Sequence, residues 1–522
     1  MSQAEVVAKP SPLQGVLDWI ERVGNKVPHP VIIFLILIAF IMVLSAAFQA
    51  AGSTVTFEQA QIGAEEPVTV TVAAQSLLDG DGLRFVFTSP VANFNNFGVV
   101  GVIVVAMIGV GMAEEVGLIA SFIKRLVKVT PPRAITFIIV LLGVLSSIAT
   151  DAGYLVLIPL AAAVFLSLGR HPLAGLAAAF AGVGGGFAVN VLITPVDGML
   201  AEITNEAIAD PANHVAITGN LFFGIVSTLL VTVVVTLLTE KFVEPRLGVY
   251  HPSEGPDTAD EPPSGELSDA EKNGLRWAFW AFLGTTAVVL ALSLPPNALL
   301  RNPETGSLIE DSPLLNSIIF LILVYFFVMG LAYGKGAGTI HGSMDVINPM
   351  TKTIAGLSGL IFLLLVISQF IAYFNYSNLG TIAAVNMADT LEAANLSTVW
   401  LILGLIAMTA IIDIFIGGVV PKWAIFAPVF VPLFIQLGIS PDLAMAAYRV
   451  GDSPVNVATP LMPYFALIVI FAERYRRKVG VGSVISLMLP YTVVLLITWS
   501  ALLVVWYLLG IPLGPGASIY LT

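Results

Sequence analysis

The sequence predicts an all-α polytopic membrane protein with two inverted-topology repeats, each containing a broken helix and a segment compatible with a re-entrant hairpin. The 522 residues are 57% hydrophobic and only 11% charged, whereas a soluble domain carries about 25% charged residues. Apolar runs of 18 residues or more recur along the chain, which is the signature of membrane-spanning helices. Polar, proline-containing interruptions also occur inside the apolar runs of both halves, as in secondary transporters.

The apolar runs define the order of the expected elements. They cover residues 29–51, 97–123, 134–168, 173–200, 221–238, 277–294, 314–333, 353–374, 400–437 and 484–509. Interruptions at 146–153, which include Asp151, and at 413–423 divide two of these runs. Backbone that is not helical is tolerated at membrane depth only where protein buries it or water reaches it. The interruptions are therefore candidates for a functional centre.

The Lys and Arg residues predict the orientation. Three bases precede the first span, and a mostly acidic segment, 52–96, follows it. The positive-inside rule then places the N-terminus in the cytoplasm and the C-terminus in the periplasm. The expected domains are a cytoplasmic N-terminus (1–28), a first membrane half (29–246), an acidic, proline-rich cytoplasmic linker (247–275) and a second membrane half with a final helix (276–522).

Two units, about 134–200 and about 400–473, repeat one another. Thirteen residues separate Pro159 from Pro172, and the same number separates Pro428 from Pro441. In each unit a small-residue helix and a glycine break follow, and then an Asn-Val…Thr-Pro sequence that begins at Asn190 or at Asn456. The Lys and Arg residues that flank the units predict that the first unit runs from the cytoplasmic side to the outer side and that the second runs from the outer side to the cytoplasmic side. This inversion makes the two breaks, with Asn190 included, the predicted substrate site.

The most polar interruption is the stretch 446–460, which carries Arg449, Asp452 and Asn456. An ionisable residue at membrane depth costs about 2.5–3.5 kcal/mol on insertion scales. Arg449 and Asp452 are three residues apart and would share one face of a helix. One interpretation is a structural ion pair. The other is that Arg449 attracts an anionic substrate and Asp452 serves a coupling cation, because a guanidinium binds a carboxylate bidentately and stays charged when buried.

Further polar residues sit beside the other breaks. Asp413 lies in an apolar run, where a carboxylate needs a partner, a proton or a cation. Asp197 follows the first Thr-Pro sequence and is either a solvated helix end or part of the site. Trp423 follows Pro421 and is either a packing residue or a ring that stacks on an aromatic substrate.

Composition and motifs exclude several other classes of protein. A net charge of −12 argues against nucleic acid as a partner. The chain has no Cys and five scattered His, so we expect neither a thiolate nor a histidine metal site. It contains no Gly-x-Ser-x-Gly and no His-Glu-x-x-His, which disfavours an intramembrane enzyme, and no cofactor is expected apart from a bound ion. A passive channel for small anions stays open as an alternative.

Three stretches resemble the p-aminobenzoyl-glutamate transporter (AbgT) family: residues 169–182, the Tyr-Arg-Val-Gly-Asp-Ser sequence at 448–453, and Leu-Pro-Tyr at 489–491. The resemblance covers nearly the whole chain. It implies a homodimer in the bacterial inner membrane, with nine transmembrane helices, two re-entrant hairpins and a cytoplasm-facing basin in each protomer. It also implies ion-coupled transport of p-aminobenzoyl-glutamate, an aromatic anion, or efflux of sulfonamide-type antimetabolites, with Na⁺ or H⁺ as the coupling ion.

The same resemblance assigns site residues. Substrate binding is expected at Asp197, Trp423, Pro441 and Arg449, and a sodium site at Asp413, Gly417, Asp452 and Asn456. The chain departs from the family pattern at two of these places. Asp413 stands where the family often has Asn, and Val-Val-Pro-Lys at 419–422 stands where it often has a small polar run. The departures add one carboxylate and one ammonium.

Overall fold

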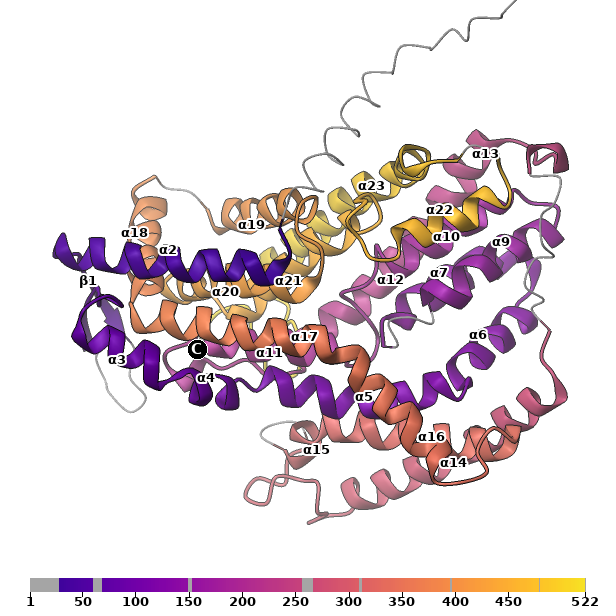
Figure 1. The fold of residues 1–522 in the computed structure, drawn as a ribbon, viewed down its shortest axis with the longest axis horizontal. Helices are drawn as coiled ribbons and strands as arrows, with labels where there is room; N and C mark the ends of the chain where they lie inside the picture. Colours follow the sequence, from indigo (N-terminus) through magenta and orange to yellow (C-terminus); the bar gives the residue numbers. More distant parts are fainter. Residues whose placement is uncertain are drawn as a thin grey trace, which may run out of the picture.

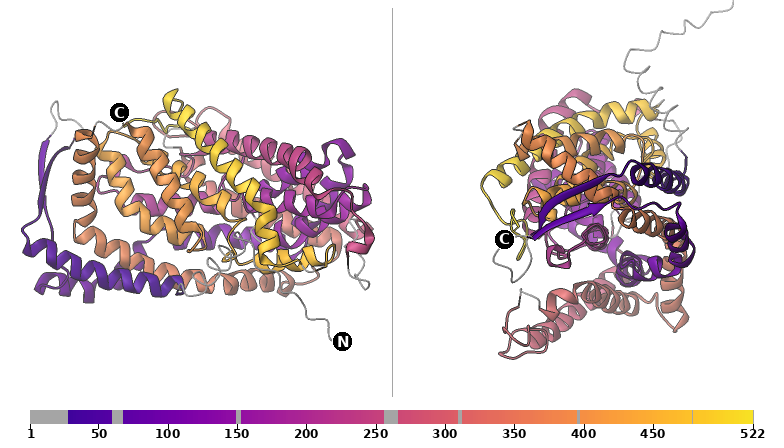
Figure 2. Two further views of the ribbon diagram at one scale, coloured as in Figure 1. Left: turned by 90° about the horizontal axis from the view of Figure 1, so that it is seen from above. Right: turned by 90° about the vertical axis from the view of Figure 1, so that its left-hand side faces the viewer.

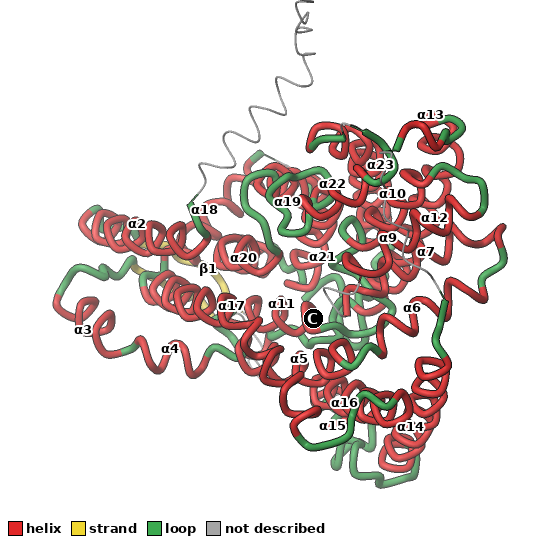
Figure 3. Tube along the Cα trace, turned by 45° about the vertical axis from the view of Figure 1, so that its right-hand side comes forward, coloured by secondary structure: helices red, strands yellow, loops and turns green. Residues whose placement is uncertain are grey.

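In the computed structural model, helices packed side by side make up most of the chain (Figures 1 and 3). The structure describes residues 28–59, 68–148, 153–255, 266–308, 312–394, 397–477 and 479–521. Within these residues, seven helices are long and apolar enough to cross a membrane, and the number rises to nine if each of two bent pairs counts as one span. The predicted all-α polytopic fold is confirmed.

The N-terminal part begins with α2 (Pro30–Ala50) and an antiparallel hairpin of β1 (Thr54–Gln59) and β2 (Val68–Ala73). The hairpin lies at one end of the molecule beside α18 (Leu379–Ala393) (Figure 2). Four helices follow it: α3 (Gly80–Thr88), α4 (Pro90–Asn96), α5 (Val99–Glu115) and α6 (Leu118–Val129). The expected single helix over 97–123 is therefore two helices. They are separated because Gly117 has a φ of 91°, a left-handed conformation that costs glycine little.

The first repeat contains α7 (Ile135–Leu145), α9 (Ile158–Ser167), α10 (Pro172–Val183) and α11 (Pro195–Glu206). The helix α7 ends where the interruption was expected, although Thr150 and Asp151 lie outside the described residues. With the 3₁₀ turns at its two ends, the helical segment covers Pro132–Ile148, which is at the short end of the ~17–25 residues that cross a bilayer. Because α10 packs against both α7 and α9, we assign α7–α9 as the hairpin and α10–α11 as the broken helix. The sequence did not identify which piece was the hairpin.

The second repeat has the same order of elements: α19 (Thr398–Asp413), α20 (Val419–Gln436), α21 (Pro441–Asp452) and α22 (Phe465–Glu473). Here α21 packs against α19 and α20, as α10 packs against α7 and α9. The break is shorter than the predicted 413–423, because Pro421 lies in the first turn of α20. Backbone N–H groups in the first turn of a helix have no partner within the helix, so a proline there removes no hydrogen bond.

One glycine in each repeat lets two helices approach closely. Gly182 and Gly451 occupy the same position, the eleventh residue, of α10 and α21. A Cβ atom at Gly182 would lie 2.7 Å from the carbonyl oxygen of Val140 in α7, and one at Gly451 would lie 2.6 Å from that of Ile406 in α19. The sequence repeat therefore corresponds to a repeated packing contact.

The remaining helices surround the repeats: α12 (Leu221–Leu238), α13 (Glu244–Leu247), α14 (Asp269–Ser293), α15 (Pro313–Asn316), α16 (Ile318–Ala337), α17 (Met344–Tyr376) and α23 (Val481–Leu508). The helix α14 packs on α16, and α16 packs on α5, as the lower part of Figure 1 shows. α14 begins at Asp269, inside the range expected for the linker, because Ser268 and Glu271 form a capping box there. Residues 256–265 of that linker lie outside the described residues.

Candidate functional site

The two helix breaks meet in the interior. The first break covers residues 184–194, between α10 and α11, and the second follows the short 3₁₀ turn Ser453–Val455 at the end of α21. The backbone N–H of Ala188 donates to Ser453 Oγ at 3.1 Å, and Arg449 Nη1 donates to the Ala188 carbonyl at 2.9 Å. The second repeat thus supplies hydrogen-bond partners to the backbone of the first break. The break needs them because its backbone is not helical and cannot satisfy its own polar groups inside a membrane.

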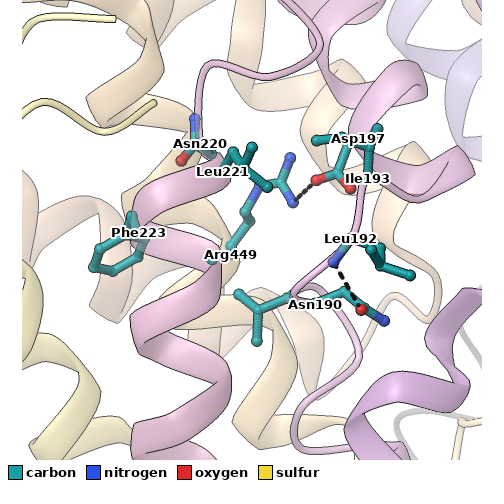
Figure 4. A pocket seen from close by; sticks show the side chains of 10 residues that line it. Asn190, Leu192, Ile193, Asp197, Asn220, Leu221, Phe223 and Arg449 are labelled. Carbon is teal, nitrogen blue, oxygen red and sulfur yellow. Dashed lines mark hydrogen bonds and ion pairs between the residues drawn. The ribbon is translucent and has the colours of Figure 1, made fainter. Parts of the chain in front are cut away.

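Arg449 and Asp197 form an ion pair between the repeats. Arg449 Nη1 lies 2.6 Å from Asp197 Oδ1, and the two side chains are 3% and 13% exposed (Figure 4). Asp197 Oδ2 accepts from both the backbone N–H and the hydroxyl of Thr194, each at 2.7 Å, in a capping box at the start of α11. A carboxylate is stabilised at a helix N-terminus. Asp197 is therefore an anchored anion rather than a solvated helix end.

A small cavity lies against this ion pair. Its interior has room for about one water molecule. The lining residues are Val189, Asn190, Leu192, Ile193, Asp197, Asn220, Leu221, Phe223, Gly224 and Arg449. Arg449 Nε is buried and has no hydrogen-bond partner among the described residues. A buried donor without a partner costs about 1–3 kcal/mol. An acceptor on a bound ligand would remove that cost.

Asn190 borders the cavity, but its side chain also holds the first hairpin. Its amide nitrogen donates to the Leu145 carbonyl at 3.1 Å and to Ser147 Oγ at 3.0 Å, while its Oδ1 accepts from the Leu192 N–H at 3.1 Å. The predicted substrate contact at Asn190 stays a prediction, and the contacts that the structure gives it are with the protein.

Trp423 and Pro441, two of the predicted substrate residues, do not line this cavity. Trp423 is fully buried, donates from Nε1 to Thr204 Oγ1 at 2.9 Å, and packs on Tyr448 with ring centroids 4.8 Å apart. Pro441 is the first residue of α21, and the hydroxyl of Ser440 caps that helix. Their roles in binding stay predictions.

The part of the cavity wall that α12 and the residue before it supply was not predicted from the sequence. Asn220, just before α12, donates to the Asp442 carbonyl at 3.1 Å, and Phe223 is completely buried. The one sequence signal for Asn220 was an amide directly before an apolar run, a pattern that also occurs at ordinary helix starts. It did not distinguish a site residue from a helix cap.

A second ionic cluster lies in the second repeat. Lys422 Nζ is 2.7 Å from Asp452 Oδ1 and also contacts Asp413 Oδ1, and all three side chains are completely buried. The Tyr448 hydroxyl donates to Asp452 Oδ1 at 3.0 Å. Asp413 and Lys422, which the sequence analysis interpreted as departures from the family pattern, are therefore in contact with each other. In the structure Asp452 pairs with Lys422, and Arg449 pairs with Asp197. The Arg449–Asp452 ion pair that the sequence suggested is therefore not the one that forms.

The other predicted sodium ligands lie near this cluster in the chain. Gly417 precedes α20, where a Cβ atom would lie 3.2 Å from the Leu461 carbonyl oxygen, and Asn456 follows the 3₁₀ turn after Asp452. Asn456 is partly exposed. No interaction recorded for the described residues joins Gly417 or Asn456 to the carboxylates, and the sodium set stays a prediction.

Comparisons with known proteins agree with the resemblance seen in the sequence. The sequence pattern of the AbgT putative transporter family matches residues 15–521. The p-aminobenzoyl-glutamate transport protein of Escherichia coli (strain K12) is 35% identical over 501 residues, which cover 95% of this chain and 96% of that protein.

Two solved structures share the fold. The YdaH transporter of Alcanivorax borkumensis, described as having an unusual topology, is 42% identical with a TM-score of 0.86, and the match covers 94% of this chain and 100% of that one. MtrF of Neisseria gonorrhoeae, described as illuminating a class of antimetabolite efflux pumps, is 39% identical with a TM-score of 0.88, over 96% and 100% of the two chains. These relatives are named as transporters or efflux pumps rather than enzymes. The chain is a polytopic membrane protein that belongs to the AbgT putative transporter family.

Proposed function

We propose that this protein is an ion-coupled secondary transporter of p-aminobenzoyl-glutamate-like aromatic anions that also exports sulfonamide-type antimetabolites. The Escherichia coli relative, a p-aminobenzoyl-glutamate transport protein, supports the first substrate class, and MtrF, described among antimetabolite efflux pumps, supports the second. The observation that carries the proposal is Arg449, a buried guanidinium that faces a cavity between the repeats with one donor unpaired.

The chemistry of Arg449 suits the carboxylates of such a substrate. A guanidinium presents its N–H groups in a planar fork that matches a carboxylate bidentately, and it stays charged when buried. Nη1 is already bound to Asp197 and to the Ala188 carbonyl, while Nε is unpaired. A substrate carboxylate at the cavity would accept from Nε and compete with Asp197 for the rest of the fork.

That competition provides a route from binding to movement. The cavity has room for only about one water molecule, whereas typical small-molecule pockets measure ~300–1,000 Å³, so its wall has to move to admit a substrate. The Arg449–Asp197 pair links α21 of one repeat to α11 of the other. A substrate that took Arg449 from Asp197 would weaken this link and allow one repeat to move against the other, as alternating access requires.

Ion coupling is part of the proposal. The buried carboxylates of Asp413 and Asp452 support an ionic role for the second repeat, because Lys422 supplies one positive charge for the two and the remaining negative charge can be balanced by a proton or a cation. The candidates for the ion are Na⁺ and H⁺.

Transport against a gradient separates this proposal from its alternatives. Purified protein in proteoliposomes should accumulate labelled p-aminobenzoyl-glutamate above its external concentration when a Na⁺ or H⁺ gradient of the appropriate direction is imposed. Equilibration without accumulation under every gradient would indicate a passive channel. Chemical conversion of the label would indicate an enzyme.

We further propose that the protein is a homodimer of the bacterial inner membrane, with a cytoplasmic N-terminus and a periplasmic C-terminus. The chain contains no Cys, so each single-Cys variant carries one reactive thiol. Cysteines at Asp210 and Asn386 should react with an impermeant reagent added from outside, whereas those at Lys128 and Arg476 should react only after permeabilisation. Labelling of the Arg476 variant from outside would contradict the inverted orientation of the repeats, and size analysis of the detergent-solubilised protein tests the dimer.

A further inference from the structure

The cluster of Asp413, Lys422 and Asp452 joins three helices of the second repeat. Asp413 is the last residue of α19, Lys422 lies in the first turn of α20, and Asp452 is the last residue of α21. The ammonium of Lys422 contacts one oxygen of each carboxylate, and no part of any of the three side chains is exposed. One positive charge thus lies between two negative charges at the tip of the second hairpin.

This arrangement does not fit the sodium ion that the family resemblance implies. Sodium would be drawn to the point where the Asp413 and Asp452 carboxylates converge, and the Lys422 ammonium is already there. A second cation bound to the same oxygens would lie in contact with an ammonium in a buried, low-dielectric environment, where repulsion between like charges is strong.

The departure at Asp413 explains why the ammonium stays. With Asn at this position, Lys422 would have the single carboxylate of Asp452 to balance its charge. Asp413 adds a second carboxylate and leaves the cluster with a net charge of −1, which favours retention of the ammonium over its removal to water. The pair of departures thus acts as one unit.

We propose that the Lys422 ammonium is the resident cation of this site and that it makes transport by this protein independent of sodium. The sodium independence of transport rests on the proposed function, whereas the claim that Lys422 occupies the site does not. A tethered cation cannot exchange with the solution, so it holds α19, α20 and α21 together permanently. Because Arg449 precedes Asp452 by three residues on α21, the same contact positions Arg449 beside Asp197.

Sodium-dependent stability tests the proposal without any substrate. Any ligand that binds only the folded state raises the melting temperature with its concentration. The melting temperature of the wild-type protein in detergent should be equal in NaCl, KCl and N-methylglucamine chloride of the same ionic strength. Lys422→Ser, which leaves both carboxylates with open space between them, should melt several degrees higher in NaCl than in the other two salts.

Two further variants serve as controls. The double variant Asp413→Asn/Lys422→Gln keeps the net charge of the cluster at −1. It should therefore fold, and it replaces Lys422→Ser in the comparison of salts if that variant does not fold. Lys352→Ser removes an exposed lysine that pairs with Glu115 at 2.7 Å, and it should show no sodium response. A sodium-specific rise in the melting temperature of the wild-type protein would overturn the proposal, whatever the variants do.

Flux distinguishes this inference from the proposed function. Wild-type uptake of p-aminobenzoyl-glutamate should be unchanged, within twofold, when N-methylglucamine replaces sodium on both sides of the membrane. A tenfold or larger loss would overturn sodium independence while supporting transport. If no uptake occurs in any salt, the substrate proposal fails, and the melting-temperature comparison still decides whether sodium binds.

Discussion

Arg449→Lys is expected to reduce flux of p-aminobenzoyl-glutamate by roughly 10- to 100-fold, without unfolding the protein. A lysine keeps the charge, but its single nitrogen cannot hold the Ala188 carbonyl and Asp197, as Nη1 does, and also present a second donor in the place of Nε to a substrate carboxylate. Hydrogen bonds to charged groups contribute about 1.5–3 kcal/mol each, and 1.4 kcal/mol corresponds to a factor of ten. The measurement is initial flux in proteoliposomes, normalised to folded protein by size-exclusion chromatography.

A purely structural ion pair predicts a different outcome in a double variant. Removing one partner of a buried pair costs about 3–5 kcal/mol, because the other charge is left uncompensated. If Arg449 served only to neutralise Asp197, Arg449→Ala/Asp197→Asn, in which the amide oxygen can still accept from Thr194, would restore much of the flux that each single variant loses. If Arg449 binds the substrate, the double variant should fold normally and remain inactive. Recovery of flux would therefore contradict the assignment of Arg449 to the substrate.

Gly182→Leu and Gly451→Leu should each destabilise the protein by at least about 1–3 kcal/mol, the usual cost of overpacking a close contact. The atoms that a new side chain would meet first are backbone carbonyl oxygens, 2.7 Å away in α7 and 2.6 Å away in α19, and these cannot rotate aside. The effect should appear as a lower melting temperature in detergent and as lower yield of monodisperse protein.

Gly404→Leu is the matched control for these variants. Gly404 is an exposed residue of α19, and a Cβ atom there would meet nothing within 4 Å. This variant should melt like the wild-type protein. Equal melting temperatures for Gly404→Leu, Gly182→Leu and Gly451→Leu would contradict the close helix packing in both repeats.

The sequence predicted the broken helices well because the breaks have local causes. Pro195 cannot continue a helix from the residues before it, and the polar stretch around Asp452 could not lie in lipid. The hairpins were harder to identify. The helices α7 and α9, which form the first hairpin, are almost entirely apolar and mostly buried in protein, so their residues look the same as those of a membrane span.

The site residues could be named from the sequence, but their partners could not. Arg449 and Asp197 were both candidates, yet they lie 252 positions apart, and no spacing rule connects residues on different helices. The spacing of Arg449 and Asp452 suggested that they pair with each other, whereas in the structure each of them pairs with a different residue. In the same way, nothing in the sequence indicated that Asp413 and Lys422 contact each other, as they do in the structure.

Binding of a neutral analogue tests the central claim, that Arg449 recognises a substrate carboxylate, most directly. Titration calorimetry would compare p-aminobenzoyl-glutamate with the analogue in which both carboxylates are amides, using wild-type protein and Arg449→Lys. The wild-type protein should bind the anion at least tenfold more tightly than the diamide, and Arg449→Lys should bind the two compounds about equally. Full preference for the anion in Arg449→Lys would contradict the account, because another residue would then be the one that recognises the carboxylate.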